Sequence, residues 1–374
     1  MTGSEQRSHG MAGDNVAPDW APLETTGVAD ILGHYPGLGG AVDILWHSPR
    51  PFSAAARVTT GNHEVFVKRH HQTVRRAGEL ATEHAFMAHL HERGIPVSRV
   101  LPDRSGHTVV IRGPWVYEVH AIATGIDLYR DRFSWEPLTD LTQAHTGGRM
   151  LAKLHQAAAD FKAPQRDTWI LVSRDDLLRA TNPAATLEAQ FERRPALAEH
   201  LARHDWKRDL APLLQRQQTM QARIHAQPRL WTHNDWHISN LCWSGHHSDA
   251  AITTVMDFGL AAPTFALYDL ATAIERNAVA WLHPERGMQA IFPDTARALI
   301  DGYAEVLPLS NADHQLLVDL LPIVHIDFAL SEIEYFHGIT RSTADADVAY
   351  HDFLLGHAAW FDSAPGRAFL RALR

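Results

Sequence analysis

The sequence predicts an α/β (α+β) protein of two lobes, with an antiparallel five-stranded sheet in the N-lobe and a mainly helical C-lobe. Two observations support this fold class. Five β-prone runs gather before about residue 120, and helical periodicity dominates most of the remainder. At 374 residues the chain is long enough for two such units. We expect a flexible leader over residues 1–22, the N-lobe over 23–120 and the C-lobe over 121–374.

Composition narrows the class of protein. Hydrophobic residues make up 45% and charged residues 21%, which is typical of a globular enzyme. The formal net charge of -9 argues against a nucleic-acid partner and is compatible with a cationic small substrate. A long apolar run and a signal peptide are both lacking, and the single cysteine, Cys242, can form no internal disulfide. We therefore expect a cytoplasmic protein without a membrane partner.

The N-lobe strands and their helix can be read in order. The sequence Gly61-Asn62 is a strong hairpin signal between the second and third strands. A helix follows over 77–94, with Leu80, Phe86 and Leu90 on its apolar face. The five expected strands are VDILW (42–46), AAARVTT (54–60), HEVFVKRH (63–70), TVVIRG (108–113) and WVYEVHAIA (115–123).

The rest of the chain reads mainly as helices. A long one is expected over 141–161, and residues 161–228 form an insertion of helical stretches without β signal. Asp269 is expected to cap the helix that follows it. A single late helix is expected over 314–339.

Three polar residues stand out between positions 231 and 259. Asp235 and Asn240 are five residues apart, and Asp257 opens an Asp-Phe-Gly triplet after an apolar run. The apolar runs NLCWS and AAITTVM, joined by GHHSD, predict a hairpin that would bring Asp257 back toward Asn240. A carboxylate that orients a hydroxyl and hard oxygen ligands for Mg²⁺ are the groups that phosphoryl transfer requires.

The segment HNDWHISN, followed by MDFG, resembles the aminoglycoside phosphotransferase-like small-molecule kinases. This family includes choline and homoserine kinases and is related to the eukaryotic protein kinases. The resemblance implies a bilobal kinase-like fold and Mg²⁺-dependent transfer of the γ-phosphate of ATP or GTP to a hydroxyl. It also implies that Asp235 orients the hydroxyl and that Asn240 and Asp257 hold the metal.

The same resemblance assigns nucleotide contacts in the N-lobe. Lys68 on the third strand would reach the α- and β-phosphates, and a carboxylate on the following helix would pair with it. Glu83 fits the family pattern best, and Glu79 is the alternative.

Two further nucleotide contacts are expected. Backbone groups over 118–122, including those of His120 and Ile122, would meet the base. The loop HSPRPFSA has two prolines and no glycine where the family usually has a glycine-rich loop. Phosphate contact there would come from amides near Ser53, from its hydroxyl or from Arg50.

The acceptor site is expected on later helices. Asn277 lies on the inward face of its helix and Glu275 on the other side. Glu332 falls near the apolar face of the late helix, where a carboxylate needs a partner, and Asp327 flanks that face. Our hypothesis is that Glu332, together with Asp327, receives an amine or guanidine.

Several alternatives stay open. His233 and His237, four residues apart, could suggest zinc, but the glutamate of a zinc-protease helix is replaced by Asn234. The acceptor could be an antibiotic or a metabolic amino alcohol, amino acid or sugar. A nucleotide-binding pseudokinase is the alternative from another class, and the oligomeric state cannot be read from the sequence.

Overall fold

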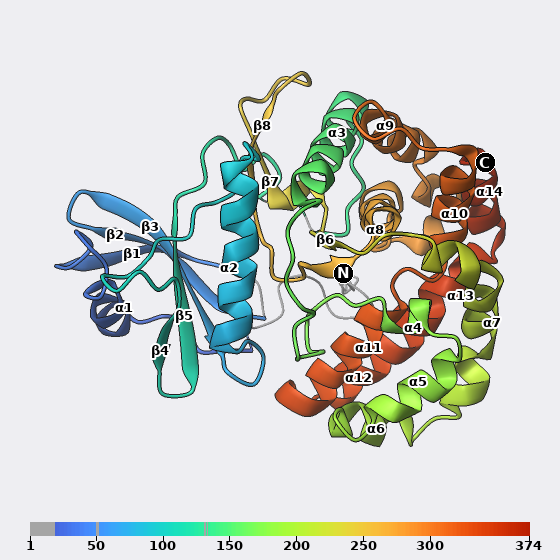
Figure 1. Cartoon of the computed structure of the whole chain (residues 1–374), viewed down its shortest axis with the longest axis horizontal. Helices are drawn as coiled ribbons and strands as arrows, with labels where there is room; N and C mark the ends of the chain where they lie inside the picture. Colours follow the sequence, from blue (N-terminus) through green and yellow to red (C-terminus); the bar gives the residue numbers. More distant parts are fainter. Residues whose placement is uncertain (1–18, 50–51, 131, 133) are drawn as a thin grey trace, which may run out of the picture.

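A computed structural model describes residues 19–49, 52–130, 132 and 134–374. It has two lobes (Figure 1). The N-lobe is a sheet with helices α1 and α2, and the C-lobe is larger and mainly helical. Most of the expected leader, 1–18, lies outside the described residues. Its last part packs on the N-lobe sheet, since the Trp20 ring stacks on His71 with centroids 5.3 Å apart.

The N-lobe is a five-stranded antiparallel sheet, as predicted. The strand order is β1-β2-β3-β5-β4, and Gly61 takes the positive φ of 56° that the β2–β3 turn requires. Helix α1 covers one face, where Val58, Val67 and Val119 form a small core with it. The elements are α1 Thr25–Leu32, β1 Val42–His47, β2 Ala54–Thr60, β3 His63–His71, α2 Ala77–Glu92, β4 Val110–Arg112 and β5 Trp115–Ala121.

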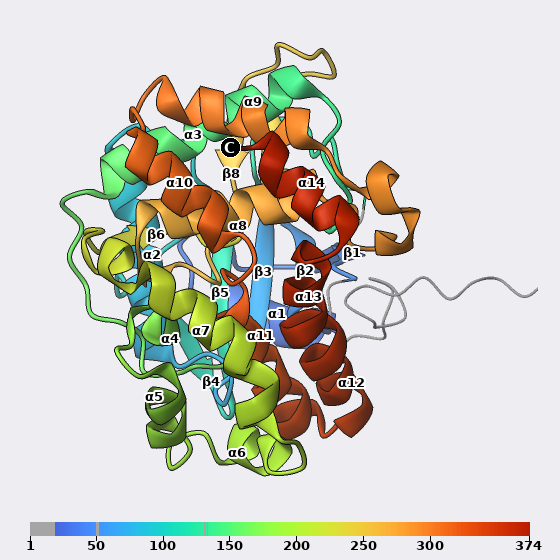
Figure 2. The same ribbon diagram turned by 90° about the vertical axis from the view of Figure 1, so that its right-hand side faces the viewer.

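The C-lobe is mainly helical and carries two small two-stranded sheets (Figure 2). Its helices are α3 Leu141–Ala158, α4 Asp176–Arg179, α5 Pro183–Gln190, α6 Pro195–Leu201, α7 Trp206–His225, α8 Ala266–Ala278, α9 Pro293–Ala304, α10 Asn311–Leu320, α11 Ile326–Tyr335, α12 Thr343–Val348, α13 His357–Phe361 and α14 Ala364–Ala372. Its strands are β6 Leu230–Thr232, β7 Leu241–Trp243, β8 Ile252–Val255 and β9 Ala262–Thr264. Its 3₁₀-helical segments are η1 Ile238–Asn240 and η2 Pro284–Ala290, and its π-helical segments are η3 Phe336–Thr340 and η4 Ala349–Gly356. Among the described residues, none of the helices is both long and apolar enough to cross a bilayer.

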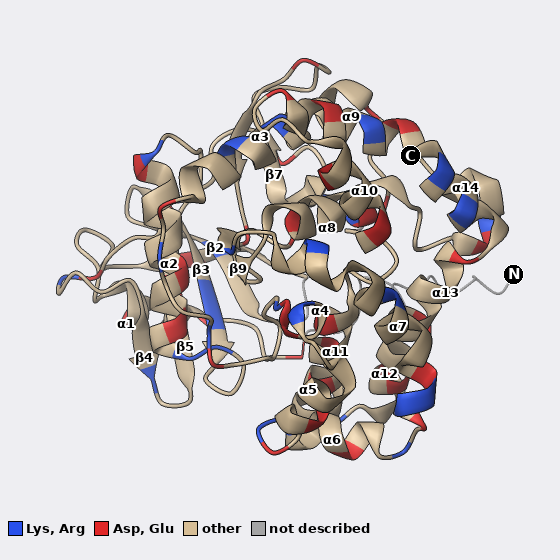
Figure 3. Cartoon of the chain, turned by 45° about the vertical axis from the view of Figure 1, so that its right-hand side comes forward, with Lys and Arg blue, Asp and Glu red and all other residues tan. Residues whose placement is uncertain are grey.

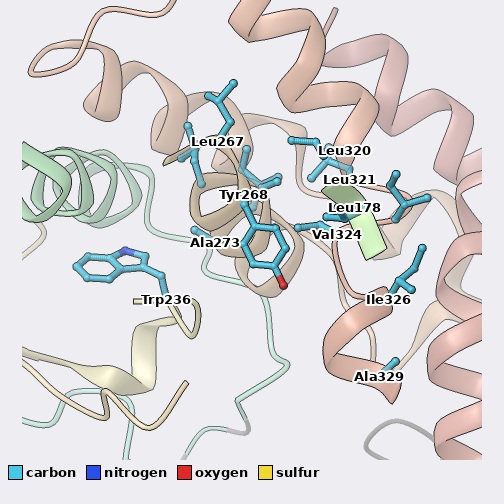
Figure 4. Close-up of a cluster of buried hydrophobic side chains, with 14 of the residues drawn as sticks. Leu178, Trp236, Leu267, Tyr268, Ala273, Leu320, Leu321, Val324, Ile326 and Ala329 are labelled. Atoms are coloured by element: carbon cyan, nitrogen blue, oxygen red, sulfur yellow. The ribbon is translucent and has the colours of Figure 1, made fainter. Parts of the chain in front are cut away.

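Helix α8 is buried at the centre of this lobe. Figure 4 shows Tyr268 and Ala273 of α8 with Trp236 on one side and Leu320, Leu321 and Val324 on another. Helices α3 and α9 approach closely because two glycines leave room. A Cβ on Gly148 would lie 2.0 Å from the carbonyl oxygen of Leu299, and one on Gly302 would lie 1.9 Å from that of His145. These contacts fix how α3 packs against α9.

The prediction of a single late helix over 314–339 is wrong. The chain forms α10, leaves the helix at Leu321, and begins α11 at Ile326. Pro322 explains the break, because it lacks an N–H and clashes with the preceding turn of a helix. The break changes the helical faces that the sequence assigned to Asp327 and Glu332.

Candidate active site

The β7–β8 hairpin brings Asn240 and Asp257 to the same end of two paired strands. Leu241 pairs with Val255, and the Met256 N–H donates to the Asn240 carbonyl over 2.9 Å. Asp257 follows at a φ of 54°, a left-handed conformation that re-aims its side chain. The predicted hairpin therefore places both residues beside each other.

Asp235 is held from two sides. Its Oδ1 lies 2.6 Å from Nη2 of Arg276, and its Oδ2 accepts from Nδ2 of Asn240 over 3.1 Å. Burial alone would raise the pKa of Asp235, but Arg276 and then His237 lower it well below its usual value. The group is thus a fixed carboxylate, suited to orienting a hydroxyl.

Lys68 lies between two carboxylates. Its Nζ is 3.6 Å from Oδ1 of Asp257 and 4.0 Å from Oε1 of Glu118, which faces it across β3 and β5. Lys68 lowers the pKa of Asp257. Burial opposes the charge of Lys68, but Asp257 and Glu118 outweigh it and raise its pKa. The Lys68 ammonium group thus lies next to Asp257, one of the two predicted metal ligands.

The expected pairing of Lys68 with Glu83 is replaced by another arrangement. Oε2 of Glu83 accepts from Nη1 of Arg166 over 2.9 Å, while Glu79 accepts from the Thr168 N–H. Arg166 comes from the start of the insertion, and burial lowers its pKa to about 10. The α2 carboxylates therefore anchor this segment, and the carboxylate within ion-pair distance of Lys68 on the sheet is Glu118.

Three histidines fix Glu118. The Nε2 atoms of His70, His84 and His120 lie 3.0, 2.7 and 2.8 Å from its carboxylate oxygens. Burial alone would raise the pKa of Glu118, but these histidines lower it well below its usual value. His84 is on α2 and the others are on the sheet, so the group joins α2 to β3 and β5.

The segment 118–122 uses part of its backbone internally. The Val119 carbonyl accepts from the Leu101 N–H over 2.7 Å, and the Ala121 N–H donates to Arg99 over 2.9 Å. The imidazole of His120 points to Glu118 rather than outward. Because this contact involves only the ring of His120, base binding by the backbone groups of His120 and Ile122 stays a prediction.

The glycine-free loop before β2 contacts the C-lobe. Arg50 lies outside the described residues, and Ser53 is half-buried just before β2. The ring of Phe52 packs edge-on against Tyr335 of α11, with centroids 5.1 Å apart. An aromatic contact thus ties this loop to the C-lobe.

Asp269 supports the loop over residues 233–240, which contains Asp235 and Asn240 and is here called the catalytic loop. Its carboxylate accepts from the N–H groups of His233 and Asn234, each over 2.8 Å, and lies 2.9 Å from Nε2 of His155. It was expected to cap its helix, but α8 begins at Ala266 and Asp269 lies inside the first turn. Its role is structural, as expected, through the loop rather than through the helix end.

The zinc alternative for His233 and His237 finds no support. Nε2 of His233 lies 2.9 Å from the Met256 carbonyl and its Nδ1 accepts from the Asp235 N–H. His237 lies 2.8 Å from the Ser239 hydroxyl through Nδ1. Both rings therefore have polar contacts within this loop or with Met256.

Glu275 and Asn277 are turned into the protein. Nδ2 of Asn277 donates to the Trp236 carbonyl over 2.8 Å, and its Oδ1 accepts from the Ile238 N–H. Glu275 lies 2.9 Å from Nδ1 of His357, and burial raises its pKa to about 7. Asn277 therefore braces the catalytic loop rather than offering its amide to an acceptor.

The structure separates Asp327 from Glu332. Asp327 accepts from the Leu177 N–H, and burial raises its pKa well above its usual value. Glu332 is only 4% exposed, and its Oε2 is buried without a hydrogen-bond partner among the described residues. Burial raises its pKa to about 8, partly offset by Arg276. The charge of Asp235 also raises this pKa.

Sequence reasoning missed Arg276 and the role of Glu118. Arg276 of α8 also lies over the Trp135 ring, 3.7 Å from its centroid (Figure 3 shows the charges of α8). Helical periodicity gives no signal for Arg276, because it lies in a run of three polar residues with Glu275 and Asn277, and such a run does not show which of them points inward. The alternation of β5 could have indicated Glu118 and His120, which share a face with Lys68 and His70 in the neighbouring strand.

The donor set fits a hard cation. Both hydrogens of the Asn240 amide are used by Asp235, which leaves Oδ1 as its ligating atom. Asp257 supplies carboxylate oxygens and is 49% exposed. One or two protein oxygens with positions left for phosphate and water are typical of Mg²⁺.

Comparison with protein families identifies one match. The model of the family described as "Phosphotransferase enzyme family" (APH) matches residues 52–309, which is more than half of the chain. The matched part includes Lys68, Asp235, Asn240 and Asp257 and ends before α10. Comparison with curated proteins gives no match.

Solved structures with the same fold are known. A microcompartment-associated aminopropanol kinase is 20% identical with a TM-score of 0.57, over 92% of this chain and 99% of that one. An amicoumacin kinase in complex with AMP-PNP, Ca²⁺ and Ami is 13% identical with a TM-score of 0.59, over 94% and 92%. A spectinomycin phosphotransferase, APH(9)-Ia, with ADP and spectinomycin, is 11% identical with a TM-score of 0.55, over 94% and 98%. These similarities establish the bilobal kinase-like fold.

Proposed function

Because the chain belongs to the phosphotransferase enzyme family, we propose that it transfers the γ-phosphate of ATP or GTP to a hydroxyl of an amine-bearing small molecule. The observation that carries the acceptor class is the Oε2 atom of Glu332, which is buried without a hydrogen-bond partner among the described residues. The solved relatives named above include kinases of an amino alcohol and of antibiotics, which supports this class of acceptor.

Asp235 would orient the acceptor hydroxyl. The strongly lowered pKa of Asp235 makes it a weak base, which suits a loose transition state in which the proton leaves late. Arg276 and Asn240 hold the carboxylate in one orientation, so the hydroxyl meets a preorganised acceptor of its hydrogen bond.

Asn240 and Asp257 would hold Mg²⁺, which supplies neutralisation of phosphate charge when it is bound. Lys68, whose Nζ is 3.6 Å from Asp257, would contact the phosphates. Glu118, 4.0 Å from the same Nζ, would hold the ammonium group in position. Amides near Ser53 would add phosphate contacts in place of a glycine-rich loop, and Ile122 would contribute to base binding. We place this reaction in the cytoplasm, where ATP and GTP are available.

Glu332 would receive the acceptor's ammonium group. A buried carboxyl costs free energy when it is ionised without a partner, and an ammonium restores that loss. The charge of Asp235 contributes to the raised pKa of Glu332, so we expect one acceptor to place its hydroxyl at Asp235 and its amine at Glu332.

The direct experiment is an acceptor panel with Mg²⁺ and either ATP or GTP. The panel pairs each amino alcohol and aminoglycoside with a neutral analogue in which the amine is replaced by a hydroxyl or hydrogen. We expect phosphorylated product, identified by mass spectrometry, from amine-bearing compounds and at least tenfold lower kcat/KM from the neutral partners.

Two variants test the roles proposed for Asp235 and Glu332. Asp235→Asn should lose turnover while it still binds nucleotide, and Glu332→Ala should raise the KM for amines without affecting nucleotide binding. Equal turnover of neutral analogues, or an unchanged acceptor KM in Glu332→Ala, would contradict the amine assignment. Nucleotide binding without turnover across the whole panel would favour a pseudokinase.

A further inference from the structure

A second group of histidines lies far from the nucleotide site, at the contact between the helical insertion and the C-terminal helices. His200 is near the end of α6, His204 is in the turn that follows it, and Asp347 is on α12. Figures 1 and 2 show α6 and α12 at the lower edge of the C-lobe. We call these three residues the insertion cluster.

Their donor atoms converge on one point. Nε2 of His200 and Nε2 of His204 each lie 3.7 Å from Oδ1 of Asp347, and the three donors are all within 4.8 Å of one another. A distance of 3.7 Å is too long for a hydrogen bond. Ligands that share one tetrahedral ion at about 2.0–2.1 Å lie about 3.3 Å apart, so a small adjustment would bring these atoms to metal-binding separation.

The same atoms are buried without hydrogen bonds. Both ring nitrogens of His200, Nε2 of His204 and Oδ1 of Asp347 are inaccessible and have no hydrogen-bond partner among the described residues. His200 is 0% exposed. A buried polar atom without a partner costs about 1–3 kcal/mol. One cation between the three side chains would satisfy three of these four atoms together.

The other histidine group of the described residues shows the contrast. His84, Glu118 and His120 also form a cluster of possible metal ligands, but there both Nε2 atoms are within 2.8 Å of the Glu118 carboxylate. That group is satisfied by its own hydrogen bonds. The insertion cluster is not, so it needs a ligand that the N-lobe group does not need.

The donor types indicate zinc. Both nitrogens of the His200 ring lack a hydrogen-bond partner among the described residues, so one of them is available to donate a lone pair to a metal. Two imidazole nitrogens and a carboxylate oxygen are a ligand set typical of Zn²⁺. Arg203 lies 4.0 Å from the other carboxylate oxygen, Oδ2, which leaves Oδ1 directed to the histidines.

We propose that His200, His204 and Asp347 bind one zinc ion that joins α6 to α12. The fourth position would be taken by water or by His337, whose ring is 5.4 Å from that of His200 and whose Nδ1 is buried without a partner. Helix α6 also packs against α11, which carries Glu332. The ion would therefore brace the helical wall behind the proposed acceptor site, and the site is independent of the phosphoryl-transfer chemistry.

The test uses the full chain without a histidine tag, stripped with EDTA and dialysed against limiting Zn²⁺. We expect one zinc per chain by elemental analysis and a rise in Tm on zinc addition. Co²⁺ in place of zinc should give the visible absorption of a four-coordinate site. His204→Gln and Asp347→Asn should each weaken zinc binding by roughly tenfold or more.

Three controls make the outcome decisive. His247→Gln removes an exposed histidine that pairs with Asp249 in the hairpin turn, and it should bind zinc as the wild type does. Circular dichroism of the zinc-free variants establishes whether they fold. Absence of zinc binding by the wild type, or unchanged binding by both cluster variants, would overturn the assignment. Zinc lost in His84→Gln but kept in His204→Gln would move the site to the N-lobe and overturn it as well.

Discussion

Glu332 holds a carboxyl group where neither water nor a hydrogen-bond partner among the described residues reaches its Oε2 atom. Arg276 partly compensates, but burial dominates and raises its pKa to about 8. Below that pH the side chain is neutral. An ammonium group bound next to it would favour the ionised form, so acceptor binding should be coupled to loss of a proton.

Acceptor use should therefore depend on pH through Glu332. We expect kcat/KM for an amine acceptor to rise as the pH increases through about 8, until the acceptor's own amine loses its proton. The rise should be absent in Glu332→Gln. The measurement is a pH–rate profile of both proteins with one acceptor, and a profile that is the same in both would contradict the assignment.

The same residue should affect stability with a defined sign. The pKa of Glu332 rises from 4.5 to about 8 on folding, so the folded state binds the proton more tightly between these values. Its contribution to the free energy of unfolding falls as the pH rises through this window. Denaturant titrations should show that Glu332→Gln loses less stability than the wild type between pH 6 and 9, an interval that spans about the upper half of that window.

Substitutions of Glu118 and Glu83 should affect different quantities, the first kcat/KM for the nucleotide and the second Tm. If Glu118 positions Lys68, Glu118→Gln should lower kcat/KM for the nucleotide by about tenfold or more, the equivalent of about 1.4 kcal/mol. Glu83→Gln should mainly lower Tm, because its partner is Arg166. His84→Gln is the matched control, since it removes one bond to Glu118 and keeps the carboxylate. A larger kinetic effect from Glu83→Gln would restore the family's usual pairing.

Among the elements, α8 has the widest set of roles in the site. It supplies Asp269 and Asn277 to the backbone of the catalytic loop and Arg276 to the carboxylate of Asp235. The loop itself has little regular structure, so its shape is fixed by these bonds from a buried helix. Rigidity of the site is therefore a property of the helix beneath it.

Removing one of these supports should affect both folding and catalysis. Asp269→Asn replaces a carboxylate that accepts two N–H bonds and contacts His155, and we expect a loss of about 2–4 kcal/mol in the free energy of unfolding and a lower kcat. Asp294→Asn, an exposed position that pairs with Arg297, should change stability by less than about 0.5 kcal/mol. Chemical denaturation and steady-state kinetics measure both effects, and a wild-type kcat in Asp269→Asn would contradict the supporting role.

Sequence patterns predicted elements better than their ends and partners. The five strands and α2 follow from alternation and helical periodicity, because each buries one or two clear faces. The late helix failed because its apolar pattern continues through Pro322, and a pattern of burial does not register a missing N–H. The partner of Glu83 could not be foreseen, since Arg166 lies 83 residues away in an insertion.

At the scale of the whole molecule, the two lobes meet at the site. Lys68 reaches from the N-lobe to Asp257, and Phe52 crosses to Tyr335 of the C-lobe. The spacing of Asp235, Asn240 and Asp257 was sufficient to predict their convergence, because a hairpin returns the chain to its start. The acceptor groups depend on how distant helices pack, and only Glu332 among the four candidates has the environment expected of a binding group.

The proposed reaction requires a metal ion and the phosphates of the nucleotide to meet at Asn240 and Asp257. Calorimetric titration of ATP and GTP with and without Mg²⁺ tests this without knowledge of the acceptor. We predict that Mg²⁺ lowers the nucleotide Kd of the wild type by at least about tenfold, that is about 1.4 kcal/mol, and that Asp257→Asn abolishes the gain. The same Kd with and without Mg²⁺, or a full gain in Asp257→Asn, would contradict the proposed site.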